Sequence, residues 1–261
     1  MPNFDSHPAG SFVWFELATT DSSAAKNFYT TLLGWEPQDA PMGPDMVYTL
    51  FRLNGRDAAG GYTMKAEDRA LGVPPNWLVY ISVDNADAAV ASAIEHGGSA
   101  LSPAFDVPNV GRMAVIRDPD GAVFAVFQPG SHKGVGIYGE PNAFCWADLQ
   151  TPGRERAAQF YGALFGWKFL PGKDKDASGY LHIVNGEQYI GGLPPARALP
   201  PGVPAHWLPY LQCNDCAAQT AKAGELGAHI LVPTMTVEGQ LTYSVLADPQ
   251  GAVLAFFAPA H

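Results

Sequence analysis

Two acidic residues stand close to tryptophan at matching points of the chain. Glu16 lies two positions after Trp14, and Asp148 lies two positions after Trp146. Residues two apart on a β-strand point to the same face, so each carboxyl group is expected beside an indole ring. Burial there raises a carboxyl pKa, which suits a proton carrier, and an ionised acid beside aromatic faces suits a flat or cationic organic ligand. Glu16 and Asp148 are therefore the predicted catalytic residues.

These two pairs belong to a repeat that spans the chain. Trp14 returns as Trp146 and Trp35 returns as Trp167, each 132 positions later. A period this long, with a non-repetitive interior, indicates two fused copies of one domain. The predicted organisation is a first domain at 1–130, a Gly-rich linker at 131–141 and a second domain at 142–261.

Each half divides again into two similar passes of strand, helix and further strands. The stretch 13–18 has the period of two that is typical of a strand: Val13, Phe15 and Leu17 alternate with Trp14, Glu16 and Ala18. Apolar residues then recur at helical spacing from 25 to 33, and Gly34 ends that helix. The other elements predicted in this half are strands around 47–53, 58–64, 77–83, 113–117 and 122–127, and a helix at 86–96.

A second strand of each half is predicted to face the same space as the acids. Its alternate positions carry Asn76, Leu78 and Tyr80 in the first half and His206, Leu208 and Tyr210 in the second. The predicted ligand-binding residues are Trp14, Asn76, Tyr80, Trp146, His206 and Tyr210. Two alternatives stay open: the tryptophans could simply fill the space as core residues, and the acids could form structural salt bridges.

The motifs around these strands resemble the vicinal oxygen chelate superfamily, which includes glyoxalase, extradiol dioxygenases and bleomycin-resistance proteins. The resemblance rests on Phe28-Tyr29 and residues 32–35 after the first strand, residues 80–84 before the second helix, and residues 118–121 before the last strand. All of these recur in the second half. The resemblance implies an α+β fold of two tandem glyoxalase-like domains. Each would contain two βαβββ modules forming a cupped mixed sheet, which in relatives holds a divalent metal and a small ligand.

The same resemblance locates four metal-ligand positions in each half. In this chain they hold Trp14, Gly60 or Gly61, Leu78 and Ala125, and then Trp146, Gly191 or Gly192, Leu208 and Ala255. None of these side chains supplies the nitrogen, sulfur or oxygen atoms that divalent ions require. We therefore predict that the protein has no metal and no other cofactor.

A displaced metal site in the second half stays open as an alternative. It would combine Asp148 with His182 and His206, two histidines that the first half lacks. Phe51 and Asn76 are their expected counterparts there. Such differences suggest that the two clefts are not equivalent.

Composition restricts the partners. The net charge is −10 and neither half is basic, which argues against nucleic acid or an anionic membrane surface as a partner. No apolar run approaches the roughly 20 residues of a membrane span. We expect a cytoplasmic protein with a small-molecule ligand, either a monomer that is an internal pseudo-dimer or a homodimer.

Two further motifs suggest other chemistry. Cys213 and Cys216 form a CxxC at a predicted strand-to-helix junction, where a helix N-terminus lowers a thiol pKa and favours redox chemistry, but the first half has valine and alanine there. Residues 134–139 spell GxGxxG inside the predicted linker, without the helix that a dinucleotide-binding loop needs. We interpret the second motif as a chance match.

Three functional hypotheses follow. The first is a glyoxalase- or bleomycin-resistance-like protein that binds a small aromatic or cationic molecule in an aromatic-lined, acid-containing cleft without the usual metal. The second is an enzyme, a lyase, isomerase or hydroxylase, with Glu16 or Asp148 as general base and Tyr80 or Tyr210 as proton donor. The third is an interaction protein with a filled, inactive cup in one half.

Overall fold

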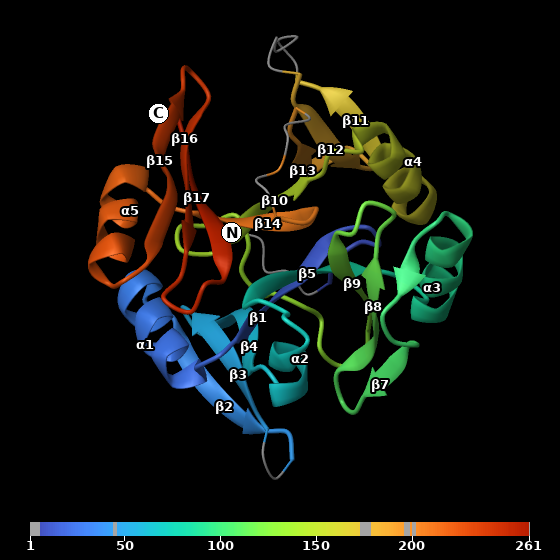
Figure 1. Ribbon diagram of the computed structural model, residues 1–261, viewed down its shortest axis with the longest axis horizontal. Coiled ribbons are helices and arrows are strands. Elements are labelled where there is room, and N and C mark those ends of the chain that lie inside the picture. The colour runs from blue at the N-terminus through green and yellow to red at the C-terminus, as the bar shows by residue number, and fades with distance from the viewer. Residues whose placement is uncertain (1–5, 44–45, 173–178, 196–198, 200–201, 261) are drawn as a thin grey trace.

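The chain folds into two cupped sheets that lie back to back (Figure 1). The computed structural model describes residues 6–43, 46–172, 179–195, 199 and 202–260. Among these, the first sheet has the strand order β2-β3-β4-β1-β5-β9-β8-β6, with β7 paired to β8, and the second has the order β11-β12-β13-β10-β14-β17-β16-β15. The predicted α+β fold of two tandem, cupped mixed sheets is confirmed.

The elements of the first half are β1 (Phe12–Thr19), α1 (Ser22–Leu33), β2 (Glu36–Pro41), β3 (Val47–Leu53), β4 (Arg56–Thr63), α2 (Ala66–Ala70), β5 (Asn76–Ser82), α3 (Ala86–Glu95), β6 (Ser99–Ala100), β7 (Phe105–Val107), β8 (Gly111–Arg117) and β9 (Val123–Pro129). Those of the second half are β10 (Phe144–Gln150), α4 (Arg154–Phe165), β11 (Lys168–Pro171), β12 (Leu181–Asn185), β13 (Gln188–Leu193), β14 (His206–Gln212), α5 (Cys216–Glu225), β15 (His229–Val237), β16 (Leu241–Ala247) and β17 (Val253–Pro259).

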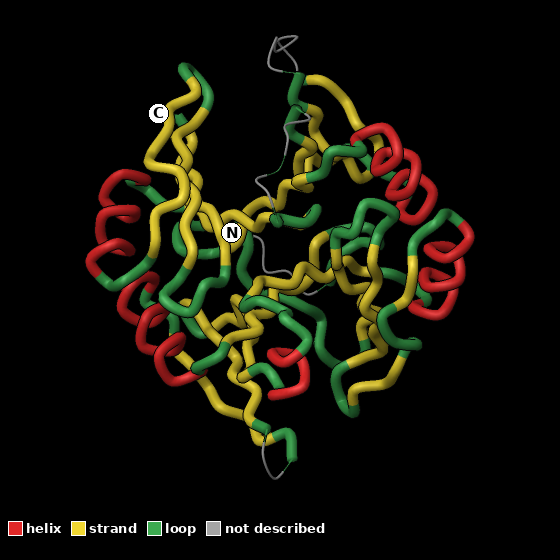
Figure 2. Tube along the Cα trace, in the orientation of Figure 1, coloured by secondary structure: helices red, strands yellow, loops and turns green. Residues whose placement is uncertain are grey.

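Local sequence signals set the ends of the helices. Asp21 caps α1, because its carboxylate accepts a hydrogen bond from the backbone nitrogen of Ala24 at 2.9 Å. Gly34 ends the helix in the left-handed conformation, with φ at 73°, and Gly166 ends α4 in the same way, with φ at 69°. Helices α1, α3, α4 and α5 lie around the outside of the molecule (Figure 2). Within the described part of the chain, no helix is long and apolar enough to cross a lipid bilayer.

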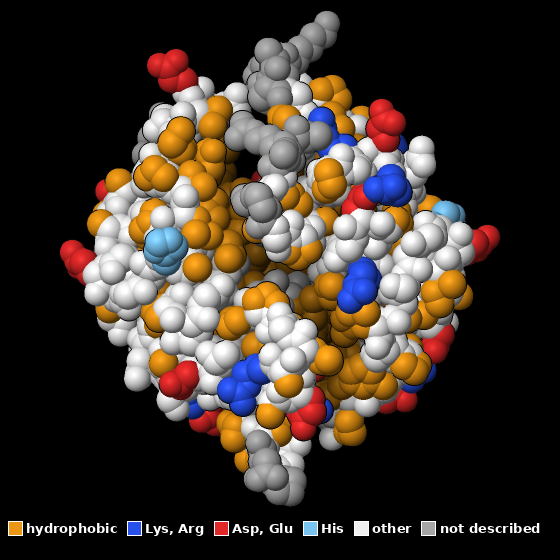
Figure 3. All heavy atoms as spheres, in the orientation of Figure 1, with side chains coloured by type: hydrophobic (Ala, Val, Ile, Leu, Met, Phe, Trp, Pro, Cys, Tyr) orange, Lys and Arg blue, Asp and Glu red, His pale blue; other side chains and the backbone are white. Residues whose placement is uncertain are grey.

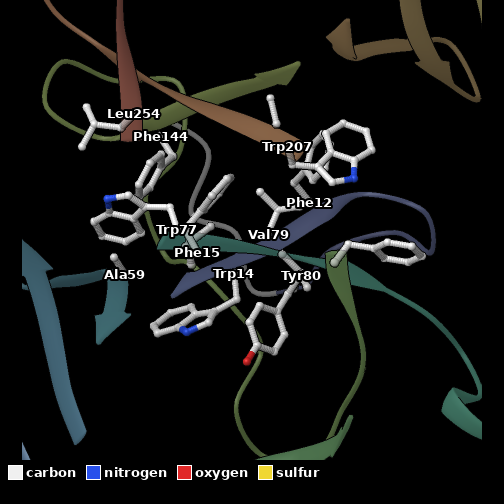
Figure 4. Packing of buried hydrophobic residues seen from close by; sticks show 14 of the residues in the cluster. Phe12, Trp14, Phe15, Ala59, Trp77, Val79, Tyr80, Phe144, Trp207 and Leu254 are labelled. Carbon is white, nitrogen blue, oxygen red and sulfur yellow. The ribbon is translucent and has the colours of Figure 1, made fainter. Parts of the chain in front are cut away.

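The central strands of each sheet have one face toward the other half and one face toward a cup. On the inner face, Phe15 of β1 stacks on Phe144 of β10, with ring centroids 4.1 Å apart. Figure 4 shows Phe15, Trp77 and Phe144 on this side, whereas Trp14 and Tyr80 point the opposite way. The strand alternation therefore divides the side chains into a core shared by both halves and a lining for the cup.

Two buried hydrogen-bond chains join the halves. The Tyr29 hydroxyl donates to Asp248 at 2.8 Å and accepts from the Trp77 indole at 3.0 Å. The Tyr161 hydroxyl donates to Asp118 at 3.0 Å and accepts from the Trp207 indole at 3.0 Å in the same arrangement. The two aspartates begin the DPDG and DPQG turns, so each residue shapes its own turn and also connects to the other half.

The segment between β9 and β10 packs along the first half. The backbone nitrogen of Val135 donates to the Val13 carbonyl at 2.9 Å, and Arg56 forms a two-pronged ion pair with Glu140 at 2.9 and 3.0 Å. A strand and not a helix follows Gly134–Gly139, which agrees with a chance match to GxGxxG. The boundaries of the predicted linker at 131–141 stay a proposal.

Candidate functional site

Glu16 lies at the centre of the first cup, where three strands meet. Its carboxylate accepts a hydrogen bond from the Tyr80 hydroxyl of β5 at 2.7 Å and another from the Tyr48 hydroxyl of β3 at 2.8 Å. The Trp14 indole donates in turn to the Tyr48 oxygen at 2.9 Å. The acid and the three aromatic residues therefore form one connected network.

Asp148 of β10 has the equivalent network in the second cup. Its Oδ1 accepts from the Tyr180 hydroxyl at 2.7 Å and from the Trp146 indole at 3.0 Å, and its Oδ2 accepts from the Tyr210 hydroxyl at 2.9 Å. The whole Asp148 residue is only 4% exposed. Three neutral donors thus converge on one buried acid.

Glycine leaves the room that these tyrosines need. Glu16 pairs across the sheet with Gly60 on β4, and Asp148 pairs with Gly192 on β13. A Cβ atom added at Gly60 would collide with the ring of Tyr48, and one added at Gly192 would collide with Tyr180. The family resemblance assigned metal-ligand side chains to these two glycine positions. The hydroxyl groups of Tyr48 and Tyr180 fill the space that such side chains would take.

The electrostatics of the two acids have a common cause. Burial raises the pKa of Glu16 and of Asp148 above the ordinary carboxyl values, while the hydrogen bonds from tyrosine act in the opposite direction. Among the described residues, no basic side chain forms an ion pair with either acid. Over the part of the chain that the structure describes, each acid is therefore balanced by neutral donors, and no salt bridge to either acid is found there.

The tyrosines act as hydrogen-bond donors. Burial and the neighbouring carboxylate raise the pKa of Tyr48, Tyr80, Tyr180 and Tyr210 well above the ordinary phenol value. These hydroxyl groups consequently keep their protons near neutral pH. They hold the carboxylates in place through hydrogen bonds, but they do not readily transfer the proton itself.

Four of the six predicted ligand-binding residues come together at the acids, namely Trp14, Tyr80, Trp146 and Tyr210. The other two do not join them. The Asn76 amide donates to the carbonyl of Pro74 at 2.9 Å, and a His206 ring nitrogen contacts the carbonyl of Pro204 at 2.9 Å. Both side chains thus bind their own chain at the start of a strand.

The expected counterpart of His182 was wrong by one position. His182 pairs with Gly192, and in the first half it is Leu50 that pairs with Gly60. Phe51 points to the core side, because successive residues of a strand face opposite ways. The His182 ring lies 6.0 Å from the Trp146 ring, so this histidine belongs to the wall of the second cup.

Tyr48 and Tyr180 also reach the acids, although no motif predicted them. The two are separated by the same 132 positions as Trp14 and Trp146, so the repeat held the signal that could have found them. Their place beside the acids depends on the pairing of β3 with β4 and of β12 with β13, which motif spacing did not reveal.

The surface is hollowed above the second cup. Figure 3 shows this hollow beside β16 and β17, with hydrophobic side chains gathered over those strands. The apolar residues that line this cup form a cluster separate from the main core, made of Leu208, Tyr210 and Ala255 with Cys145, Trp146, Tyr243, Val245, Val253 and Phe257 packed against them.

Known proteins resemble the chain in sequence and in fold. "Putative glyoxylase CFP32" of Mycobacterium tuberculosis is 35% identical over 100% of this chain and 99% of its own length. "Anthracycline biosynthesis protein DnrV" of Streptomyces peucetius is 32% identical over 93% of this chain and 91% of its own. The Mn(II)-bound glyoxalase from Novosphingobium aromaticivorans superposes with a TM-score of 0.65 at 17% identity, covering 96% of this chain and 82% of that one.

The prediction that the protein has no metal cofactor is contradicted by this comparison. A structural neighbour with the same tandem fold binds Mn(II), so a metal is normal for the fold. The prediction was drawn from four positions per half, and the loss of donors there does not decide whether an ion binds elsewhere. The described side chains nevertheless contain no group of three or more His, Cys, Asp or Glu that could hold an ion, and Asp148, His182 and His206 do not assemble into a site.

Sequence matches along the whole chain show its family. The model of the Glyoxalase/Bleomycin resistance protein/Dioxygenase superfamily matches residues 11–126, the first of the two cupped sheets. Relatives of 31–35% identity extend the match through the second sheet. The chain therefore belongs to the Glyoxalase/Bleomycin resistance protein/Dioxygenase superfamily.

Proposed function

We propose that the protein binds a small aromatic or cationic molecule in an acid-containing, aromatic-lined cleft. The observation that carries this proposal is the environment of Asp148 and Glu16. Each acid faces a cup, accepts hydrogen bonds from neutral aromatic side chains, and has no basic partner among the described residues. A carboxylate in this setting attracts a cation more strongly than one in water.

The aromatic residues supply the second half of the recognition. Trp146, Tyr180 and Tyr210 surround Asp148, and aromatic faces contribute about 0.5–2 kcal/mol each through stacking or cation–π contact. A relative is named for anthracycline biosynthesis, and an anthracycline contains fused rings. That name supports a flat aromatic ligand for this chain as well.

The proposal is tested with N-methylacridinium, a flat and permanently charged probe, in a fluorescence titration. Replacing Asp148 with asparagine removes the charge and keeps the shape. Affinity for the probe should fall tenfold or more, because losing the partner of a desolvated charge costs about 2 kcal/mol or more. Glu16→Gln is the equivalent change in the first half, and Asp84→Asn on the exposed surface is the control. Unchanged affinity in the Glu16→Gln/Asp148→Asn double variant would refute a role for the acids.

Cation binding should also depend on pH. Because burial raises the carboxyl pKa, the acids stay protonated and neutral to a higher pH than free carboxyl groups. Affinity for N-methylacridinium should therefore be low at acid pH and rise as the pH increases through these raised pKa values. A neutral ring of similar size, 9-anthracenemethanol, should show a flat profile, and so should the double variant with the cation. A cation profile that falls with increasing pH would contradict the assignment.

Catalysis is the second candidate function, and one observation favours it. A buried carboxyl group with a raised pKa, oriented by tyrosine, is suited to act as a general base, and one relative is named a glyoxylase. In this role Asp148 or Glu16 would remove a proton from carbon while Tyr210 or Tyr80 donates a hydrogen bond. Incubation with methylglyoxal hemithioacetal in D₂O tests it. Deuterium incorporation that Asp148→Asn and Glu16→Gln abolish supports a base, and none in the unmodified protein opposes it.

Other partner predictions stay as proposals. We expect no nucleic-acid partner, in keeping with the charge of −10. We also expect a monomer, since the two halves already pair through their cores, with a homodimer as the alternative. A cytoplasmic location is the corresponding prediction for the cell.

A further inference from the structure

The aromatic walls of the two cups differ in their exposure. In the first cup, Trp14 is 6% exposed and Phe127 is 3% exposed. Their counterparts in the second cup, Trp146 and Phe257, are both partly exposed. The first pair belongs to the main core, whereas the second pair belongs to the separate cluster that lines the hollow of Figure 3. Equivalent strands thus present a covered wall in one half and an open wall in the other.

His132 covers the wall of the first cup. Its ring lies edge-on to Trp14, with centroids 4.7 Å apart, and 6.4 Å from the ring of Phe127. The backbone nitrogen of Gly134 donates to its Nδ1 at 3.3 Å, and its Nε2 faces a carboxylate oxygen of Asp57 at 3.6 Å. His132 therefore sits where a flat ligand would contact Trp14.

The chain around His132 is fixed in this position. The backbone of Val135 binds the Val13 carbonyl, and His7 contacts the Val135 carbonyl at 2.9 Å. A Cβ atom at Gly134 would collide with Val13, so the segment runs directly against β1. The covering is thus part of the packed structure of the first half.

The acids differ in the opposite sense. Glu16 is partly exposed, whereas Asp148 is buried beneath its three aromatic donors. In the first cup a ligand cannot reach the indole face, because His132 packs against it. In the second cup it can approach the rings, with the acid behind them. A flat ring gains more from the second arrangement, since stacking requires an open aromatic face.

We infer that a flat aromatic ligand binds in the second cup only, against Trp146, Phe257 and Tyr243, and that His132 fills the equivalent space of the first cup. This inference rests on the proposed function, because it states which of the two clefts takes the ligand and through which surface. The partly exposed Tyr243 lies opposite Phe257 across the β16–β17 pair, on the same wall. The first cup then has an acid but no stacking surface for such a ligand.

The test counts the sites and then creates one. Isothermal titration with N-methylacridinium should give one site per chain. Trp146→Ala should weaken that site about tenfold or more, and Phe105→Ala, at an exposed aromatic residue of β7 outside both cups, should leave it unchanged. His132→Gly should uncover Trp14 and give a second site. Two equal sites in the unmodified protein, or full affinity in Trp146→Ala, would overturn the inference.

Two further measurements keep the outcomes separate. If His132→Gly does not fold, as judged by circular dichroism, Phe257→Ala replaces it, and this variant should weaken the single site while Phe127→Leu should not. A probe that binds the unmodified protein and is lost in Glu16→Gln but not in Trp146→Ala would place the ligand in the first cup, and would refute this inference alone. Absence of any binding by the unmodified protein to N-methylacridinium or 9-anthracenemethanol would refute the proposed function itself.

Discussion

Replacing Asp248 with alanine should lower the free energy of unfolding by about 3–5 kcal/mol, the cost typical of breaking a buried charged network. The side chain accepts the hydroxyl of Tyr29 and the backbone nitrogens of Gln250, Gly251 and Ala252. Alanine leaves all four donors without their partner in a site where water does not replace it. Urea unfolding followed by circular dichroism measures the change.

Two comparisons isolate the connection between the halves. Tyr29→Phe removes only the donor to Asp248 and the acceptor for the Trp77 indole, so it should cost about 1–3 kcal/mol. Asp84→Ala, at an exposed aspartate, should change stability by about 0.5 kcal/mol or less. If Asp248→Ala were no more destabilising than Asp84→Ala, the buried chain of hydrogen bonds would not be holding the two halves together.

Replacing Gly192 with alanine should disrupt the second cup. The new methyl group would collide with the hydroxyl of Tyr180 and crowd Oδ1 of Asp148. The ring must therefore leave the carboxylate, which removes one of its three donors. Overpacking of this kind costs about 1–3 kcal/mol in stability. Affinity for N-methylacridinium should fall at least tenfold, or about 1.4 kcal/mol, in a fluorescence titration.

Gly224 provides the matched control. It lies exposed on α5, where an added methyl group meets only Ile230 at 4.0 Å. Gly224→Ala should therefore raise stability by about 0.5–1 kcal/mol through helix propensity and leave binding unchanged. Equal binding by Gly192→Ala and Gly224→Ala would show that the position of Tyr180 does not matter for the ligand.

Much of the fold could be predicted because local patterns and the repeat agree. Apolar alternation gave β1, helical spacing from 25 to 33 gave α1, and the motifs at Asp118 and Asp248 marked the turn before each final strand. The short strands β6 and β7 and the edge strand β2 were not identified. Their side chains are mostly exposed and carry no strong apolar period.

The candidate site was predicted where it depended on alternation within one strand, or on the family resemblance, which set a second strand with Tyr80 and Tyr210 against the same cup. The side chains of Trp14 and Glu16 share a face because they are two apart, and the structure agrees. Tyr48 reaches Glu16 through the pairing of three strands, and His132 reaches Trp14 through a segment that crosses the cup. Such contacts depend on tertiary structure, and the periodicity of a single segment carries no information about contacts between segments.

The covalent union of the halves has a consequence for how the two clefts can diverge. When two identical subunits form a pair, every substitution is copied into both of their hollows, so neither can be altered alone. In this chain Trp14 and Trp146 are encoded separately, and their surroundings differ: His132 packs against Trp14 with ring centroids 4.7 Å apart, whereas the ring of His182 lies 6.0 Å from Trp146. Because the halves are fused, they can acquire different substitutions. One hollow can therefore be filled by side chains while the other stays open to small molecules.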